Sequence, residues 1–105
     1  MVTVPKFWLV LFKDDATMLD IRAQKGEEHL AFLNKNRDKI HLGGGLRFQS
    51  DTPFIGGAWV VEAQSEQDVA NLVQKDPYYQ PQNRKYEIYY WGFALDEMIE
   101  RVAAI

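Results

Sequence analysis

One segment limits the folds that this chain can adopt: residues 6–13 read Lys-Phe-Trp-Leu-Val-Leu-Phe-Lys. A short aromatic and aliphatic run bounded by charged residues predicts a β-strand. The residues that point to one face of this strand and those that point to the other are all apolar, which is typical of a central strand covered on both sides. The chain must therefore build a sheet around this strand and bury both faces of that sheet.

The next segment predicts a helix. Apolar residues recur at helical spacing from about Met18 to Asp38, with Gly26 and His29 at the margin of the apolar stripe. Because glycine weakens a helix by about 1 kcal/mol relative to alanine, the helix could begin only near Gly26. The expected buried stripe consists of Leu19, Ala23, Leu30 and Leu33.

The order of the remaining segments predicts the topology. Strands are expected over 40–49, 55–62 and 84–94, and a tail helix over 95–105. A short helix should begin after the N-cap Ser65 and end before Pro77. This order predicts an α+β, ferredoxin-like βαββαβ fold with a four-stranded antiparallel sheet. The 105 residues suit a single domain, with a core over about 6–93 followed by the tail.

Composition excludes several kinds of site. The chain has no cysteine, so disulfides, zinc-thiolate sites and thiol nucleophiles are excluded, and a cytoplasmic location is expected. The net charge is −3 and the basic residues are scattered, which makes a nucleic-acid partner unexpected. No apolar run approaches the roughly 20 residues of a membrane helix.

The sheet predicts a homodimer. Two helices can cover only one face of a four-stranded sheet, and the other face measures roughly 350 Å² in projection. Monomers rarely expose an apolar patch of this size, so a second copy packed face to face is the expected cover. The tail helix, folded over the open face of its own chain, is the competing explanation.

Only His29 and His41 have side chains that ordinarily titrate near neutrality. The predicted topology places His29 and Asp76 on the same side of the sheet, where a carboxylate could orient the imidazole for acid/base catalysis. Asp76 precedes Pro77, so it could equally be a plain turn residue. No acidic residue is expected to be aimed at His41.

Two further features could border a ligand. The run Gly43–Gly45 lacks the spacing and the Lys-Ser/Thr ending of a phosphate loop. In a strand such glycines leave clearance, so Gly44 and Gly45 are candidates for contact with a ligand or with the partner chain. Tyr78 and Tyr79 follow Asp76 in a loop and could wall a pocket.

Three stretches carry a family resemblance: Glu28–Leu33, Gly57–Glu62 with the helix after Ser65, and Asp76–Tyr78. Together they resemble the YciI-like, or YCII-related, family over roughly 6–93. The resemblance implies a dimeric α+β barrel whose proposed His–Asp pair falls on His29 and Asp76. Related proteins of this fold include a dehydrochlorinase that acts on a chlorinated hydroxyhydroquinone. Muconolactone isomerase is a more distant relative by fold.

The resemblance thus implies an acid/base enzyme of a small cyclic or aromatic compound, needing neither metal nor organic cofactor. The main alternative is a non-catalytic dimer that binds or senses a small molecule. An interaction module is a further alternative, as is a haem-degrading or monooxygenase enzyme of the same fold, although the two histidines give no basis for a haem ligand. The chain departs from the family pattern where Gly26 replaces an arginine three residues before the histidine, with Arg22 one turn earlier. Gly44-Gly45 replaces Gly-Pro, and Ala58 replaces a serine. Losing the arginine and the hydroxyl weakens the expectation of an anionic substrate.

Overall fold

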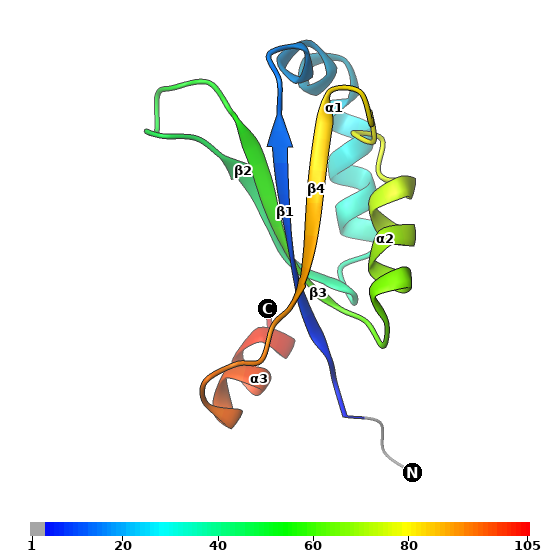
Figure 1. The fold of residues 1–105 in the computed structure, drawn as a ribbon, viewed down its shortest axis with the longest axis vertical. Helices are drawn as coiled ribbons and strands as arrows, with labels where there is room; N and C mark the ends of the chain where they lie inside the picture. Colours follow the sequence, from blue (N-terminus) through cyan, green and yellow to red (C-terminus); the bar gives the residue numbers. More distant parts are fainter. Residues whose placement is uncertain (1–3) are drawn as a thin grey trace.

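The computed structural model describes residues 4–105 and contains four strands and three helices there. In chain order they are β1 (Phe7–Asp14), α1 (Thr17–Lys35), β2 (Ile40–Leu46), β3 (Gly56–Glu62), α2 (Glu66–Lys75), β4 (Arg84–Tyr90) and α3 (Asp96–Ala103) (Figure 1). Strands β2 and β4 are a few residues shorter than expected. Within this part of the chain, no helix is both long enough and apolar enough to cross a lipid bilayer.

The sheet has the order β2-β3-β1-β4, and every neighbouring pair is antiparallel. The ferredoxin-like topology and the central place of β1 are confirmed. Helices α1 and α2 cover one face of the sheet, as Figure 1 shows. Between them and the sheet lies the core, which includes Val10, Phe12, Trp59 and Val61 from the strands and Val69, Leu72 and Val73 from α2.

Helix α2 forms for the reasons read from the sequence. The Ser65 hydroxyl accepts the N–H of Asp68 at 3.2 Å and so caps the first turn. The helix ends at Lys75, and Asp76 is extended at φ −65° and ψ 131°, because a proline follows it. The end of this helix therefore holds Asp76 in a defined place beside the core.

Helix α1 corrects two expectations. It begins at Thr17 and runs unbroken through Gly26, so the later start is wrong. The expected stripe is wrong in part: Leu30 is 65% exposed and Leu19 38%, whereas Leu33 packs against the core as expected. The helix buries Met18 and turns Arg22 and His29 toward the inside of the fold, where partners from other elements hold them.

The open face of the sheet keeps exposed apolar side chains, among them Leu11, Leu42 and Tyr89. Helix α3 lies at one end of the sheet, on the side away from α1 and α2 (Figure 1). The ring of Phe93, just before this helix, contacts the ring of Phe7 at 5.1 Å between centroids. The tail therefore covers that end of its own sheet and leaves the rest of the open face bare.

Candidate functional site

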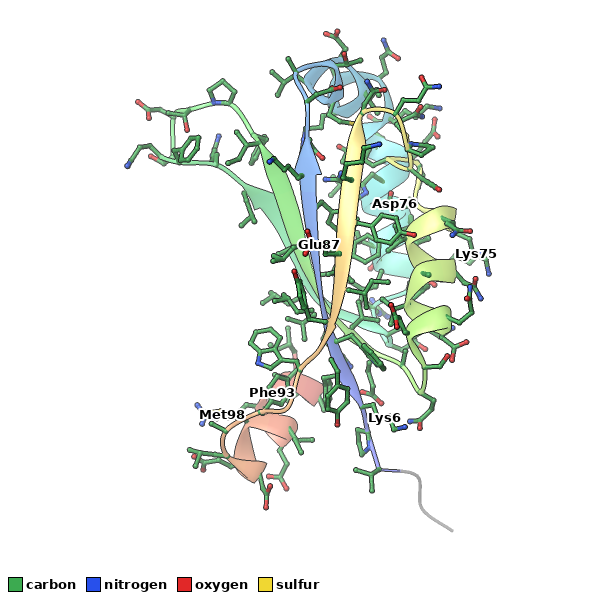
Figure 2. The ribbon with its side chains drawn as sticks, viewed as in Figure 1. Lys6, Lys75, Asp76, Glu87, Phe93 and Met98 are labelled. Carbon is green, nitrogen blue, oxygen red and sulfur yellow. The ribbon has the colours of Figure 1, made fainter. Side chains whose placement is uncertain are left out.

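The centre of the candidate site is the contact between α1 and the end of α2. The Nδ1 atom of His29 lies 2.7 Å from Oδ1 of Asp76. The two side chains are 12% and 2% exposed, so water screens the contact poorly. Figure 2 shows Asp76 on the inner side of α2, whereas its neighbour Lys75 lies on the outer side.

The surroundings of Asp76 decide which imidazole nitrogen carries a proton. Oδ1 of Asp76 also accepts the backbone N–H of Tyr78 at 3.0 Å, so this oxygen acts as an acceptor. The Nδ1 atom of His29 must then donate, which leaves Nε2 of a neutral ring with its lone pair. Oδ2 of Asp76 is buried and has no hydrogen-bond partner within residues 4–105.

Tyr78 lies directly against the imidazole. Its ring stacks on His29 at 3.8 Å between centroids, with the two planes 9° apart. A Cβ atom built on Gly26 would lie 3.5 Å from the Tyr78 hydroxyl, and any longer side chain there would need that space. The glycine that departs from the family pattern thus makes room for Tyr78.

Two arginines flank the same tyrosine, and one buried carboxylate joins them. The side chain of Asp14 is fully buried; its Oδ1 lies 2.8 Å from Nε of Arg84 and its Oδ2 3.2 Å from Arg22. Each guanidinium lies 5.5 Å from the centroid of the Tyr78 ring. Asp76 is the second carboxylate near this tyrosine, so two positive and two negative charges surround Tyr78.

Sequence reasoning missed Asp14 and Arg84. The signal that could have found them is their position at the matching ends of β1 and β4, where the register pairs them. That pairing is visible only after the two strands are aligned, because 70 residues separate the two side chains.

The glycine run divides between the two faces of the sheet. A Cβ on Gly45 would lie 2.6 Å from the ring of Phe54, which the guanidinium of Arg22 covers at 4.6 Å. Gly45 therefore makes room for the Phe54 ring beside Arg22. A Cβ on Gly44 would meet nothing within 4 Å. Gly44 instead borders a hollow of about 300 Å³ that includes Leu42 and Ala58 of the open face.

The space beside the His–Asp contact is small. A hollow lined by Asp76, Tyr78, Tyr79 and Arg84 among others offers about 10 Å³, enough for roughly one water molecule. A larger hollow of about 430 Å³ lies elsewhere, between α2 and the segment that includes Lys39 and Glu62. Residues 4–105 contain no cluster of three or more metal-binding side chains of the His, Cys, Asp or Glu type.

The prediction that no acidic residue faces His41 is wrong. Its Nε2 lies 2.9 Å from Oε1 of Glu62, and its side chain is 7% exposed. The reason is an irregularity in the β2–β3 register between Ile40 and Leu42, which sets His41 apart from regular pairing. Its ring lies 5.9 Å from that of Phe7, whereas His29 contacts Tyr78 and Asp76, so the two histidines have different neighbours.

The surroundings of Tyr78 predict an alkaline transition. Burial raises the pKa of its phenol above the ordinary value of 10.0, with the Arg22 charge opposing that rise. The folded state therefore keeps a proton that the unfolded chain loses above pH about 10. Stability from this group is present below that pH and disappears as the pH rises through the folded pKa.

Absorbance titration of the phenolate should show a late-titrating tyrosine that Tyr78→Phe removes. Tyr89→Phe is the control, because the hydrogen bond to Glu87 raises the pKa of that exposed phenol as well. A late phase that survives in Tyr78→Phe and vanishes in Tyr89→Phe would contradict the assignment to Tyr78.

The chain was compared with protein families, with curated proteins and with solved structures. A model of the YCII-related domain family matches residues 6–92. No curated protein matches the chain.

Among solved structures, the fold is similar to 5-chloro-2-hydroxyhydroquinone dehydrochlorinase (TftG) from Burkholderia phenoliruptrix AC1100, in complex with 2,5-dihydroxybenzoquinone. The identity is 26% and the TM-score 0.72, over 84% of this chain and 95% of that chain. A dimeric ferredoxin-like protein from an uncultured marine organism matches at 8% identity and a TM-score of 0.49, over 89% of this chain and 99% of that one.

Proposed function

This chain belongs to the YCII-related family, and we propose that it is an acid/base enzyme, independent of cofactors, acting on a small cyclic or aromatic compound. One observation carries the proposal: the 2.7 Å contact that makes Nδ1 of His29 a donor to Asp76. This contact leaves Nε2 as the atom that takes a proton from the substrate. The similarity to a dehydrochlorinase supports a ring substrate with a leaving group.

In the proposed step, Nε2 of His29 removes a proton from the substrate while Asp76 steadies the imidazolium that forms. For a chlorinated ring, chloride leaves with the electron pair of the broken carbon–chlorine bond. The acid/base contribution to such a step is about 10²–10⁴-fold. The guanidinium groups of Arg22 and Arg84 lie beside the Tyr78 ring, where in the proposed step they favour negative charge that develops on a ring oxygen.

A substrate ring can reach His29 and Asp76 only if part of the protein moves. The hollow beside Asp76 offers about 10 Å³, far less than a six-membered ring occupies. The Tyr78 ring already takes the stacked position over His29 that a planar substrate would use. The proposed enzyme therefore opens by displacing the loop of Tyr78 and Tyr79, which follows the C-terminal end of α2.

We further propose that two copies assemble through their open sheet faces. The exposed apolar residues on that face, including Leu11, Leu42 and Tyr89, support this arrangement because water contact with them is unfavourable. The partner sheet would also close the hollow beside Gly44.

A second candidate is a non-catalytic dimer that binds a small molecule. One observation favours it: the apolar hollow of about 300 Å³ at Gly44 is much larger than the space at Asp76. In that case the His29–Asp76 contact serves to join α1 to α2, and the ligand sits on the other face of the sheet.

The test is an assay of the purified full chain with 5-chloro-2-hydroxyhydroquinone. Chloride release above the rate in buffer is expected, together with calorimetric binding of 2,5-dihydroxybenzoquinone. Binding without release would favour the non-catalytic dimer. The absence of both release and binding would contradict a dehydrochlorinase-like function.

A further inference from the structure

Helix α3 is the part of the chain that the family does not explain. The family match ends at residue 92, and α3 spans Asp96–Ala103. Its polar side carries the exposed ion pair between Glu97 and Arg101. Its apolar side consists of Leu95, Met98, Ile99 and Val102.

A helix this short needs a surface to pack on. Isolated helices below about 12–15 residues are marginal in water, and α3 has 8. Met98, Ile99 and Val102 are only partly buried by their own chain, no residue of α3 is fully buried, and Leu95, which precedes it, is 51% exposed. The packing that stabilises α3 is therefore incomplete in the single chain.

The position of α3 shows what could complete that packing. It lies at the end of the open sheet face, where Phe93 contacts both Phe7 and Trp91. Figure 2 shows Phe93 and Met98 together at this end of the molecule. The apolar side of α3 thus adjoins the surface that the proposed homodimer covers.

We propose that α3 is a dimer clasp whose apolar side packs against the second copy of the chain. The inference rests on the homodimer of the proposed function. Asp96, Glu97 and Glu100 give the helix an acidic polar side, which disfavours an anionic membrane or nucleic acid as the occupant.

The area of the open face supports this role for α3. The four-strand face offers roughly 350 Å² in projection, and its accessible area is larger. A standard interface buries about 800 Å² of accessible surface per partner. A helix of 8 residues is about 12 Å long and about 10 Å wide, so it enlarges the projected face by about a third.

Sedimentation equilibrium of the full chain tests the clasp. Ile99→Glu places a charge on the apolar side, and a chain ending at Ala94 lacks the helix. Both should raise the dimer dissociation constant at least about tenfold, which corresponds to about 1.4 kcal/mol. Glu100→Gln, on the polar side, is the matched control and should stay within about twofold of the parent chain.

The outcomes separate the two proposals. If Ile99→Glu and the shortened chain keep the parent dissociation constant, the clasp is overturned and the dimer through the sheet faces stands. If the full chain stays monomeric at high concentration, both the dimer and the clasp are overturned. Far-ultraviolet circular dichroism of Ile99→Glu checks that any loss of dimer does not arise from an unfolded core.

Discussion

Exchanging His29 for asparagine is expected to lower turnover by about 10²–10⁴-fold. The amide nitrogen of asparagine can take the place of Nδ1 and still donate to Asp76, which lies 2.7 Å away. What the variant lacks is a nitrogen at the position of Nε2 that can take and release a proton. Steady-state kinetics should therefore show the loss in kcat, while thermal unfolding shifts by only a few degrees.

The chain offers a matched control in its second histidine. His41 is likewise buried and bonded to a carboxylate, with Nε2 at 2.9 Å from Glu62. His41→Gln preserves a donor at Nε2 and should leave turnover within about twofold of the parent. Equal turnover in the His29→Asn variant and the parent would end the catalytic role of the His29–Asp76 pair, because the fold would be intact and only the proton acceptor lost.

Replacing Asp14 with alanine is expected to destabilise the fold by about 3–5 kcal/mol, because it leaves two buried guanidinium groups without their shared carboxylate. The side chain of Asp14 is fully buried, and those of Arg22 and Arg84 are 16% and 6% exposed. In a domain of this size, each 1 kcal/mol lowers the melting temperature by about 4–8 °C. Urea unfolding followed by tryptophan fluorescence measures the change.

Asp20→Ala is the control for Asp14, since Asp20 is an exposed acid in the first turn of α1. Its loss should cost no more than about 1 kcal/mol. The double variant Asp14→Ala with Arg84→Met should recover part of the lost stability, because it removes one of the two unpaired charges. A single Asp14→Ala variant as stable as Asp20→Ala would show that water screens the arginines after all.

Local patterns predicted most of the fold. The central place of β1, the cap at Ser65 and the end of α2 before Pro77 each follow from a few neighbouring residues. Such signals survive in the folded protein because they depend on alternation, capping and proline sterics within one element. The same reading placed His29 and Asp76 on one side of the sheet, and the structure sets them 2.7 Å apart.

The inward face of α1 could not be read in this way. Periodicity reports apolar burial, so it selected Leu30, which the structure leaves 65% exposed. Arg22 and His29 turn inward because Asp14, at the end of β1, and Asp76, after α2, meet them from other elements. A pattern of apolar residues cannot predict the burial of a polar side chain, because its hydrogen-bond partner is brought beside it only when the chain folds.

The sequence by itself determined the order of strands and helices, the central apolar strand and the chemical types of the site residues. Tertiary structure alone decided which of these residues meet. It joined Asp14 to two arginines, gave His41 a carboxylate partner, set Phe54 against Gly45 and left about 10 Å³ beside Asp76. The physical reason is that contacts and cavities depend on the register and packing of distant segments, whereas strands and helices begin from the preferences of neighbouring residues.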